Sequence, residues 1–341
     1  MYDLLIVGAG ITAATIVSLL KKTHKICIID TRLYFGGNCS DYEDNGSFIH
    51  LHGPHIYHST SKAVTDHLSK YTKWKDYNYA VEAEIEHDGK IVTAPFPYSR
   101  LTAKSLGREL TQDEVIDRFF KGYSTKMWGM DWDKLPTVIK NRVPKDTAEQ
   151  PNYFPGQFVG MPDKGFSHMI ANMMDGVTIR LGVPTDEWVR IPARKVIFTG
   201  RPDLIKVPGE NATFGEVYGL NLAYRTLQID FRTVGDWPYR APVLNCCHTK
   251  IAYSRITNYA KLTGGNSNIT SFETPKAIVP DEVSPYYPLP TPEQHVIWQN
   301  LTSTIRQHYP SILFAGRLGS HKYLDMFQAV GQGLALVKAT I

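Results

Sequence analysis

The first thirty residues alternate between short apolar runs and a helical pattern of apolar positions. Residues 3–7 form a largely apolar run of β type, and a helical pattern with the small residue Ala13 follows glycines at 8 and 10. This order predicts a strand, a tight turn and a helix N-terminus that points its backbone N–H groups at a phosphate. Gly8 would allow the turn, Gly10 would let the backbone approach the phosphate, and Ala13 would permit close packing of helix and strand.

A second apolar run, at 25–30, ends in an acid. Asp30 lies about 20 residues beyond the glycine turn, where a ribose-binding carboxylate belongs. The pair Gly36-Gly37, followed by Asn38, comes just after it. Such a pair is more typical of flavin proteins than of nicotinamide proteins, although an ordinary glycine turn is the alternative. The N-terminal pattern as a whole predicts dinucleotide binding.

The middle of the chain changes its period twice. Residues 61–72 have a helical pattern, whereas 81–93 alternate on both sides of Asp88-Gly89, which is typical of a β-hairpin. Helical periodicity returns over 100–140 and predicts a helical insertion.

Three aromatic residues of this helical segment, Phe120, Tyr123 and Trp128, do not follow one helical stripe. Two interpretations stay open: the rings belong to a hydrophobic core, or they stack on a nucleobase.

The second half of the chain predicts loops around a cleft, followed by strands. Prolines, glycines and aromatics crowd residues 141–175, which predicts ordered loops and edge strands. Residues 285–288 (PYYP) predict a turn that exposes two aromatic side chains. From 312 onwards a strand, a glycine turn and a helix follow again and predict a second unit that faces phosphate or flavin. Further strands are expected at 194–200, 224–231 and 243–256.

Composition sets the class of protein. A chain of 341 residues is long enough for two or three lobes, and its 43% hydrophobic and 21% charged residues are ordinary for a globular protein. No apolar run approaches the roughly 20 residues that cross a bilayer. The first strand begins next to Met1, which leaves no room for a signal peptide, so we expect a cytoplasmic protein without a membrane span. The formal charge of +4 is too small to indicate nucleic acid and suits small anionic ligands.

Histidine and cysteine spacing could indicate a metal. Histidines stand at 50, 52, 55 and 58, but no nearby cysteine or carboxylate cluster completes a zinc site, so we predict no metal. Packing beside a cofactor or substrate is the interpretation that we prefer for these histidines. The four cysteines have neither metal nor disulfide spacing, which fits a reducing cytosol.

Taken together, these stretches resemble the UDP-galactopyranose mutase family, flavin enzymes that interconvert pyranose and furanose nucleotide sugars. The similarity covers essentially the whole chain, and its specificity comes from the order and spacing of many short motifs. The matching segments are Gly-Gly-Asn at 36–38, Gly-Pro-His-Ile-Tyr-His at 53–58, Tyr-Ser-Thr-Lys-Met-Trp at 123–128, Arg142-Val-Pro, Tyr153-Phe, Tyr224-Arg-Thr-Leu, Tyr253-Ser-Arg-Ile-Thr, Tyr286-Tyr-Pro and Gly316-Arg-Leu-Gly with Tyr323-Leu-Asp-Met.

The resemblance implies an α/β fold in three parts. A Rossmann-like FAD-binding domain would comprise 1–78, 177–215 and 302–341. A helical insertion domain would span 98–140. An antiparallel β-sheet substrate domain would comprise 79–97, 141–176 and 216–301. The substrate would lie in a cleft between them, over the flavin.

The resemblance also assigns site residues. Arg142 and Arg255 would grip the diphosphate, and His55 and His58 would sit by the isoalloxazine; these four are the predicted catalytic group. The arginines suit this role because guanidinium makes bidentate phosphate contacts. The predicted substrate-binding residues are Phe120, Tyr123 and Trp128 at the uridine end, with Tyr153, Arg225, Asn245, Tyr287 and Tyr323 around them. The predicted cofactor-binding residues are Gly8, Gly10, Ala13, Asp30, Gly37, Asn38, His55, Gly316, Arg317, Asp325 and Met326.

In the reaction that the resemblance implies, reduced flavin N5 attacks the anomeric carbon and expels the nucleoside diphosphate, which returns after the sugar has reclosed. FAD would be active when reduced, with NADH or NADPH as the reductant, and the partner would be a nucleotide sugar; a homodimer stays open. Two rival interpretations are an amine-oxidase-like flavoprotein, which shares the FAD motifs, and a non-catalytic nucleotide-sugar-binding or flavin-binding protein.

Departures from the family pattern leave the sugar open. Tyr98 and Ser99 stand where an apolar residue and an asparagine are usual, His321 replaces an aromatic residue, and polar sequence near Thr65 replaces a tryptophan. We expect these positions near the sugar and nucleotide. UDP-arabinopyranose, dTDP-fucopyranose and UDP-N-acetylgalactosamine therefore stand beside UDP-galactopyranose as candidate substrates.

Overall fold

A five-stranded parallel sheet forms the centre of one half of the molecule. The computed structural model describes all residues except 142, 144–147, 152, 279–284 and 341. Every neighbouring pair of strands in this sheet is parallel. The order is β10 (Thr178–Leu181), β2 (Ile26–Asp30), β1 (Tyr2–Val7), β11 (Ala193–Phe198) and β17 (Ile312–Phe314).

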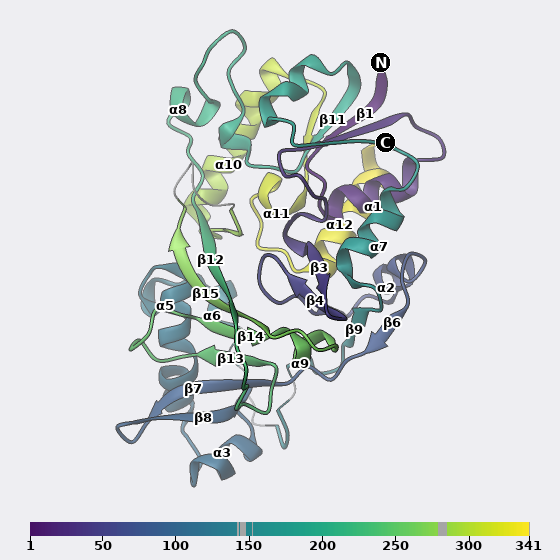
Figure 1. Ribbon diagram of the computed structural model, residues 1–341. Coiled ribbons are helices and arrows are strands. Elements are labelled where there is room, and N and C mark those ends of the chain that lie inside the picture. The colour runs from purple at the N-terminus through teal and green to yellow at the C-terminus, as the bar shows by residue number, and fades with distance from the viewer. Residues whose placement is uncertain (142, 144–147, 152, 279–284, 341) are drawn as a thin grey trace.

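Both faces of this sheet are covered, which explains why β1 is continuously apolar. Leu4 and Ile6 pack in one core cluster with residues of α1 (Ile11–Leu20), whereas Leu5 and Val7 pack in a second cluster with residues of α10 (Pro292–His308). Figure 1 shows α1, α7 (Gly165–Met174) and α12 (Met326–Thr340) side by side on the first face. The predicted strand, turn and helix at the N-terminus are confirmed.

Helix α7 corrects the prediction of loops and edge strands over 141–175. The strand part is confirmed by β9 (Phe158–Pro162), but 165–174 form a helix whose Phe166, Met169, Ile170 and Met173 are fully buried. These positions follow the i, i+3, i+4, i+7 period of an amphipathic helix, so the signal was present in the sequence. The helix packs against α1 and β3 (Asp41–Asp44), so it lies with the parallel sheet.

A seven-stranded sheet forms the other half, and its neighbours are antiparallel except for one pair, β13 and β7. The predicted hairpin is confirmed, with Asp88 and Gly89 at φ 49° and 77°, as a type I′ turn requires. The order is β16 (Tyr287–Pro288), β12 (Tyr224–Thr233), β15 (Ile269–Ala277), β14 (Arg255–Asn258), β13 (Val243–Cys246), β7 (Val81–His87) and β8 (Lys90–Phe96).

The turn predicted at 285–288, with two exposed aromatic rings, is wrong. Tyr286 and Tyr287 are 6% and 7% exposed, and β16 pairs with the edge of β12. A segment with two prolines has few backbone donors, so it suits an edge strand. Both rings are buried in a cluster that includes Met127 and Trp128.

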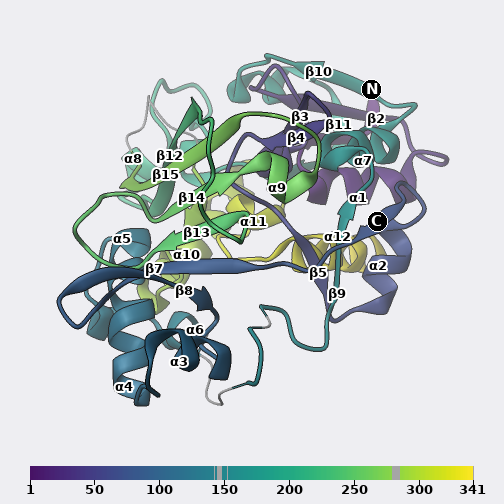
Figure 2. The same ribbon diagram turned by 60° about the horizontal axis from the view of Figure 1, so that its bottom comes forward.

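The predicted helical segment is confirmed as several short helices; α3 and η2 pack on the β7–β8 end of the sheet (Figure 2), and α5 packs on β15. They are α3 (Arg100–Leu106), α4 (Gln112–Val115), a π-helical turn η2 (Ile116–Lys121), α5 (Gly122–Trp128), η3 (Trp132–Lys134) and α6 (Thr137–Lys140). The remaining elements are η1 (Gly37–Cys39), β4 (Ser47–His50), β5 (Tyr57–Ser59), α2 (Lys62–Leu68), β6 (Trp74–Asp76), η4 (Thr185–Arg190), η5 (Pro202–Leu204), α8 (Phe214–Tyr218), α9 (Tyr259–Thr263) and α11 (Gly316–Gly319). Among the described residues, no helix has the length and apolar composition of a membrane span.

Candidate functional site

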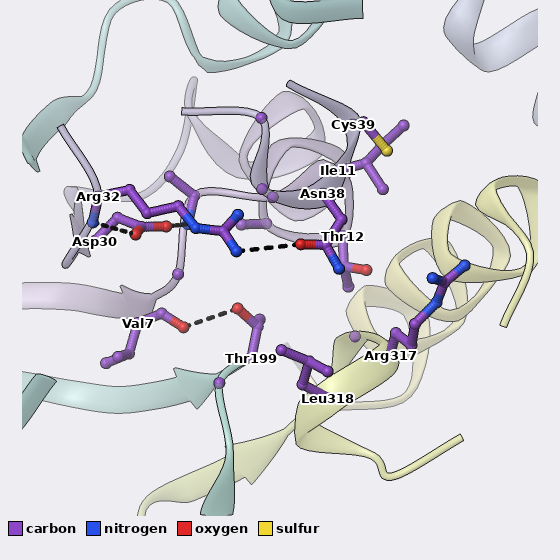
Figure 3. Close-up of a pocket in the computed structure, with 18 of the residues that line it drawn as sticks. Val7, Ile11, Thr12, Asp30, Arg32, Asn38, Cys39, Thr199, Arg317 and Leu318 are labelled. Carbon is purple, nitrogen blue, oxygen red and sulfur yellow. Dashed lines mark hydrogen bonds between the residues drawn. The ribbon is translucent and has the colours of Figure 1, made fainter. Parts of the chain in front are cut away.

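A cavity of about 310 Å³ lies at the carboxyl ends of the parallel strands (Figure 3). Ligands of open α/β sheets bind at this edge. Ten of the eleven predicted cofactor-binding residues line it, and the eleventh, Asp325, lines a second cavity. The ten are Gly8, Gly10, Ala13, Asp30, Gly37, Asn38, His55, Gly316, Arg317 and Met326.

Glycines shape this first cavity because their neighbours leave no room for a Cβ atom. Gly8 has φ +107°, and a Cβ there would lie 2.0 Å from the Oγ1 of Thr199, which donates to the Val7 carbonyl. Gly37 has φ +60°, and its Cβ would lie 3.0 Å from the Cα of Gly10, the N-cap of α1. The two glycine turns therefore form a cradle of bare backbone at a helix N-terminus, which fits the diphosphate of a dinucleotide.

Asp30 holds the rim of this cradle. Its Oδ2 accepts from the Ala9 amide at 2.8 Å and its Oδ1 from the Arg32 amide at 2.9 Å. The Arg32 guanidinium donates to the Asn38 side chain at 3.1 Å, so the two loops are tied together (Figure 3). Because a carboxylate accepts about four hydrogen bonds, Asp30 keeps acceptor capacity for a ribose.

A second cavity, of about 800 Å³, lies between the antiparallel sheet and the helical insertion. It shares His55, Arg317 and Met326 with the first cavity, so the two meet at these residues. Most predicted catalytic and substrate-binding residues line it, namely His55, His58, Phe120, Tyr123, Trp128, Tyr153, Asn245, Arg255, Tyr287 and Tyr323.

Arg255 supplies a fixed positive charge to this second cavity. It faces Glu273 across strands β14 and β15, and its Nε and Nη2 donate to the Glu273 carboxylate at 2.7–3.0 Å. Burial disfavours the charged guanidinium, but the fully buried Glu273 outweighs it and raises the pKa of Arg255 well above its usual value. A buried carboxylate thus holds the arginine in one orientation with its charge retained.

His55 is held as a neutral ring where the two cavities meet. Its Nδ1 lies 2.7 Å from the Gly53 carbonyl, which can only accept, so Nδ1 carries the proton. Burial, with His50 and Arg317 nearby, lowers the pKa of His55 to about 3. The unprotonated Nε2 lies 3.4 Å from the Tyr286 hydroxyl and is an acceptor.

His58 lies along the wall of the second cavity. It stacks on Phe154 with ring centroids 3.8 Å apart, and its Nδ1 lies 2.9 Å from Gln157 Oε1. In the part of the chain that the structure describes, no group of three or more histidine, cysteine and acidic residues could hold a metal.

Three histidines with lowered pKa values predict a loss of stability in mild acid. Burial lowers the pKa values of His50, His52 and His55 to about 3, whereas the unfolded chain protonates them near pH 6.5. Below pH 6.5 the unfolded state therefore binds more protons, and each histidine lowers the free energy of unfolding by up to about 1.4 kcal/mol per pH unit. We expect the urea midpoint to fall steeply between pH 7 and pH 5.

His50→Asn is the matched variant for this prediction. Asparagine keeps an acceptor for the His55 amide, which donates to His50 Nδ1 at 2.8 Å, but it cannot titrate. We expect the free energy of unfolding of the variant to fall less steeply with decreasing pH, by the contribution of about one proton. An unchanged slope would show that His50 is not protonated on unfolding.

Two predicted residues are not among the described residues that line the cavities, for different reasons. Arg142 lies outside the described residues. Arg225 lines neither cavity; its Nε and Nη2 donate to the carbonyls of Met127 and Lys126, each at 3.1 Å, at the C-terminal end of α5. A helix C-terminus presents unpaired carbonyls, which an arginine satisfies well.

The departures from the family pattern do not all lie near the second cavity. Tyr98 lines it, but Ser99 is the N-cap of α3. His321 bonds the Ala223 carbonyl at 3.1 Å and lines neither cavity, and Thr65 bonds the buried Tyr57 hydroxyl at 3.0 Å. Of the four positions, only Tyr98 lines one of the two cavities.

Sequence reasoning missed one residue that lines the second cavity, Tyr79, and one that holds a lining residue in place, Glu273. Tyr79 stacks on Phe154 with ring centroids 5.8 Å apart and meets Tyr153 edge-on at 5.0 Å, so it extends the stack of His58 and Phe154. Its place just before the hairpin was the only signal. Glu273 was missed because an acid within a strand pairs with Arg255 only through the strand register.

Comparison with known proteins gives matches over the whole chain. The family profile described as UDP-galactopyranose mutase matches residues 118–323, and a profile described as NAD(P)-binding Rossmann-like domain matches 6–71. A probable UDP-galactopyranose mutase of Klebsiella pneumoniae is 27% identical, over 97% of this chain and 93% of that protein. A dTDP-fucopyranose mutase of Escherichia coli is 26% identical, over 96% of this chain and 95% of that protein.

Solved structures match in fold. A crystal structure of reduced UDP-galactopyranose mutase has a TM-score of 0.70 and 14% identity, and covers 100% of this chain and 95% of that chain. A putative protoporphyrinogen oxidase from Exiguobacterium has a TM-score of 0.60 and 12% identity, with 98% of both chains covered.

Proposed function

The chain belongs to the UDP-galactopyranose mutase family of isomerases, and from this premise we propose that it interconverts the pyranose and furanose forms of a nucleotide sugar. UDP-galactopyranose and dTDP-fucopyranose are the first candidates, since mutases of both names are relatives over almost the full chain. The observation that carries the proposal is the junction of the two cavities at His55, Arg317 and Met326. A cofactor in the first cavity would face a sugar in the second.

FAD is the proposed cofactor, with NADH or NADPH as its reductant. The glycine cradle and α1 would hold the diphosphate, Asp30 the ribose, and Arg317 and Met326 the far side of the flavin. When bound and reduced, FAD supplies a nucleophilic nitrogen to the anomeric carbon of the sugar. His55 would lie beside the flavin as a neutral acceptor.

Arg255 would bind the diphosphate of the nucleotide sugar. Its charge stabilises the departing nucleoside diphosphate, and the Glu273 contact orients the guanidinium before the substrate arrives. Arg142 is proposed as the second phosphate ligand. With the diphosphate held in place, the same molecule can return to the sugar after ring opening.

Tyrosines surround this diphosphate position as neutral donors. Burial raises the pKa of Tyr286 to about 12 and the pKa of Tyr287 well above its usual value, so both hydroxyls keep their protons. Arg317 lies over the rings of Tyr286, Tyr287 and Tyr323, with distances of 5.5–5.7 Å to the centroids. Its positive charge and the tyrosine rings thus fix one another at the cavity junction.

The nucleoside would lie at the far end of the second cavity, against Phe120, Tyr123 and Trp128. Tyr123 and Trp128 form the aromatic wall of α5. Trp128 meets Tyr323 edge-on at 5.2 Å and packs on Tyr287 at 5.6 Å, so this aromatic wall runs on to the diphosphate position. We propose that Tyr153, Asn245 and His58 border the sugar.

Oxygen and reductant stoichiometry test the mutase against the oxidase interpretation. The reaction is redox-neutral overall, so we expect one equivalent of dithionite to support many turnovers under anaerobic conditions. When air is admitted, we expect the only oxygen uptake to be the slow reoxidation of the flavin. Substrate conversion that stops at one turnover per reductant, or oxygen uptake that matches product, would contradict the proposal.

A further inference from the structure

The ammonium of Lys126 is enclosed by backbone carbonyls. Its Nζ donates to the carbonyl oxygens of Cys246 at 2.6 Å, Tyr253 at 2.7 Å and His248 at 2.8 Å, and that of Ile251 lies 3.4 Å away. An ammonium has three donors, and three short contacts use them all. The arrangement is therefore a small cage of carbonyl oxygens around one positive charge.

The loop that forms this cage joins two residues of the second cavity. Residues 246–253 run from the last residue of β13 towards β14; Asn245 lies on β13 and Arg255 begins β14. The Cys246 amide closes the loop on the Ser254 carbonyl at 2.8 Å. Four carbonyl oxygens that converge on one point repel one another, so a cation between them stabilises this conformation of the loop.

Lys126 lies on α5, between the cavity-lining residues Tyr123 and Trp128. The start of this helix also packs backbone to backbone on the loop, because a Cβ at Gly122 would lie 2.1 Å from the Cys247 carbonyl oxygen. Arg225 holds the other end of the helix through the carbonyls of Lys126 and Met127. The ammonium thus sits where the aromatic wall meets the loop between Asn245 and Arg255.

We propose that Lys126 is a positioning residue that acts as a tethered monovalent cation: it orders the 246–253 loop and so sets the distance between the aromatic wall of α5 and Arg255. Rings of carbonyls bind free monovalent cations in the same manner. The proposal rests on the proposed function in one respect, namely that Arg255 and the wall of α5 bind the two ends of one nucleotide. It assigns Lys126 no contact with substrate or cofactor.

The test uses cation rescue of UDP binding by the FAD-loaded protein. Lys126→Ala removes the ammonium and leaves space, and Lys126→Met removes the charge but keeps the space filled. In choline chloride we expect both variants to bind UDP at least about tenfold more weakly than the natural protein. Ammonium or potassium chloride at the same ionic strength should restore most of the affinity to Lys126→Ala, saturably, and should not restore it to Lys126→Met.

Thermal unfolding keeps the test independent of nucleotide binding. Ammonium should raise the melting temperature of Lys126→Ala relative to choline and leave that of Lys126→Met unchanged. The proposal is overturned by unaltered UDP affinity of Lys126→Ala, or by equal responses of the two variants to ammonium. If the natural protein binds neither UDP nor dTDP, the proposed function fails, and the melting temperatures still decide whether the cage holds a cation.

Discussion

Replacing Arg255 with alanine is expected to lower kcat/KM for the nucleotide sugar by about 100- to 1,000-fold. Two described arginines, Arg255 and Arg317, line the second cavity, and Arg255 is the one whose guanidinium is paired with a fully buried acid, Glu273. Its charge is retained whatever the pH of the assay, since its pKa is raised well above the usual value. Steady-state kinetics with the reduced enzyme measure the loss.

A double variant separates this catalytic effect from stability. Arg255→Ala leaves Glu273 buried without its cation, which destabilises the fold. Arg255→Met with Glu273→Gln removes both charges and should recover much of the melting temperature but none of the activity. A folded Arg255→Ala protein with activity within about threefold of the natural protein would refute the diphosphate role.

Substituting alanine for Gly8 is expected to abolish cofactor retention. The new methyl group would lie 2.0 Å from Thr199 Oγ1, and the backbone has φ +107°, where L side chains are strained. Moving Thr199 aside breaks its bond to the Val7 carbonyl and distorts the cradle. We expect purified Gly8→Ala protein to carry less than about a tenth of the FAD of the natural protein, measured by flavin absorbance per chain.

Gly209→Ala is the matched control for this variant. Gly209 also has a positive φ, +80°, but its Cβ would meet no atom within 4 Å, and the residue lines neither cavity. It should lose about 1 kcal/mol of stability and keep its FAD. Equal FAD contents in the two variants would show that the cradle at Gly8 is not the cofactor site.

The hydrophobic period and the turn residues of short segments predicted the parts of the fold that form from neighbouring residues. The glycine turn at 8–13, the hairpin at Asp88-Gly89 and the helical insertion each combine a clear period with residues that suit the required backbone angles. Helix α7 was missed because prolines and glycines around it outweighed its apolar period. Tyr286 and Tyr287 were predicted to be exposed because nothing local shows that they pack with Met127 and Trp128.

Many of the residues that line the two cavities were predictable as a set, but the contacts that each one makes were not. An arginine between strand residues can face a cavity, as Arg255 does, or satisfy a helix end, as Arg225 does. The difference depends on the strand register and on the packing of α5, which are tertiary properties. For the same reason Glu273 carried no signal of its own.

Chromatography of products from reduced, FAD-loaded protein tests the central claim most directly. The panel would contain UDP-galactopyranose, dTDP-fucopyranose, UDP-arabinopyranose and UDP-N-acetylgalactosamine, with unreduced protein as the control. We predict that at least one of them gives its furanose isomer over many turnovers per equivalent of reductant, and that the unreduced protein gives none. The account is contradicted if the reduced protein forms no furanose from any of the four while it steadily oxidises an amine.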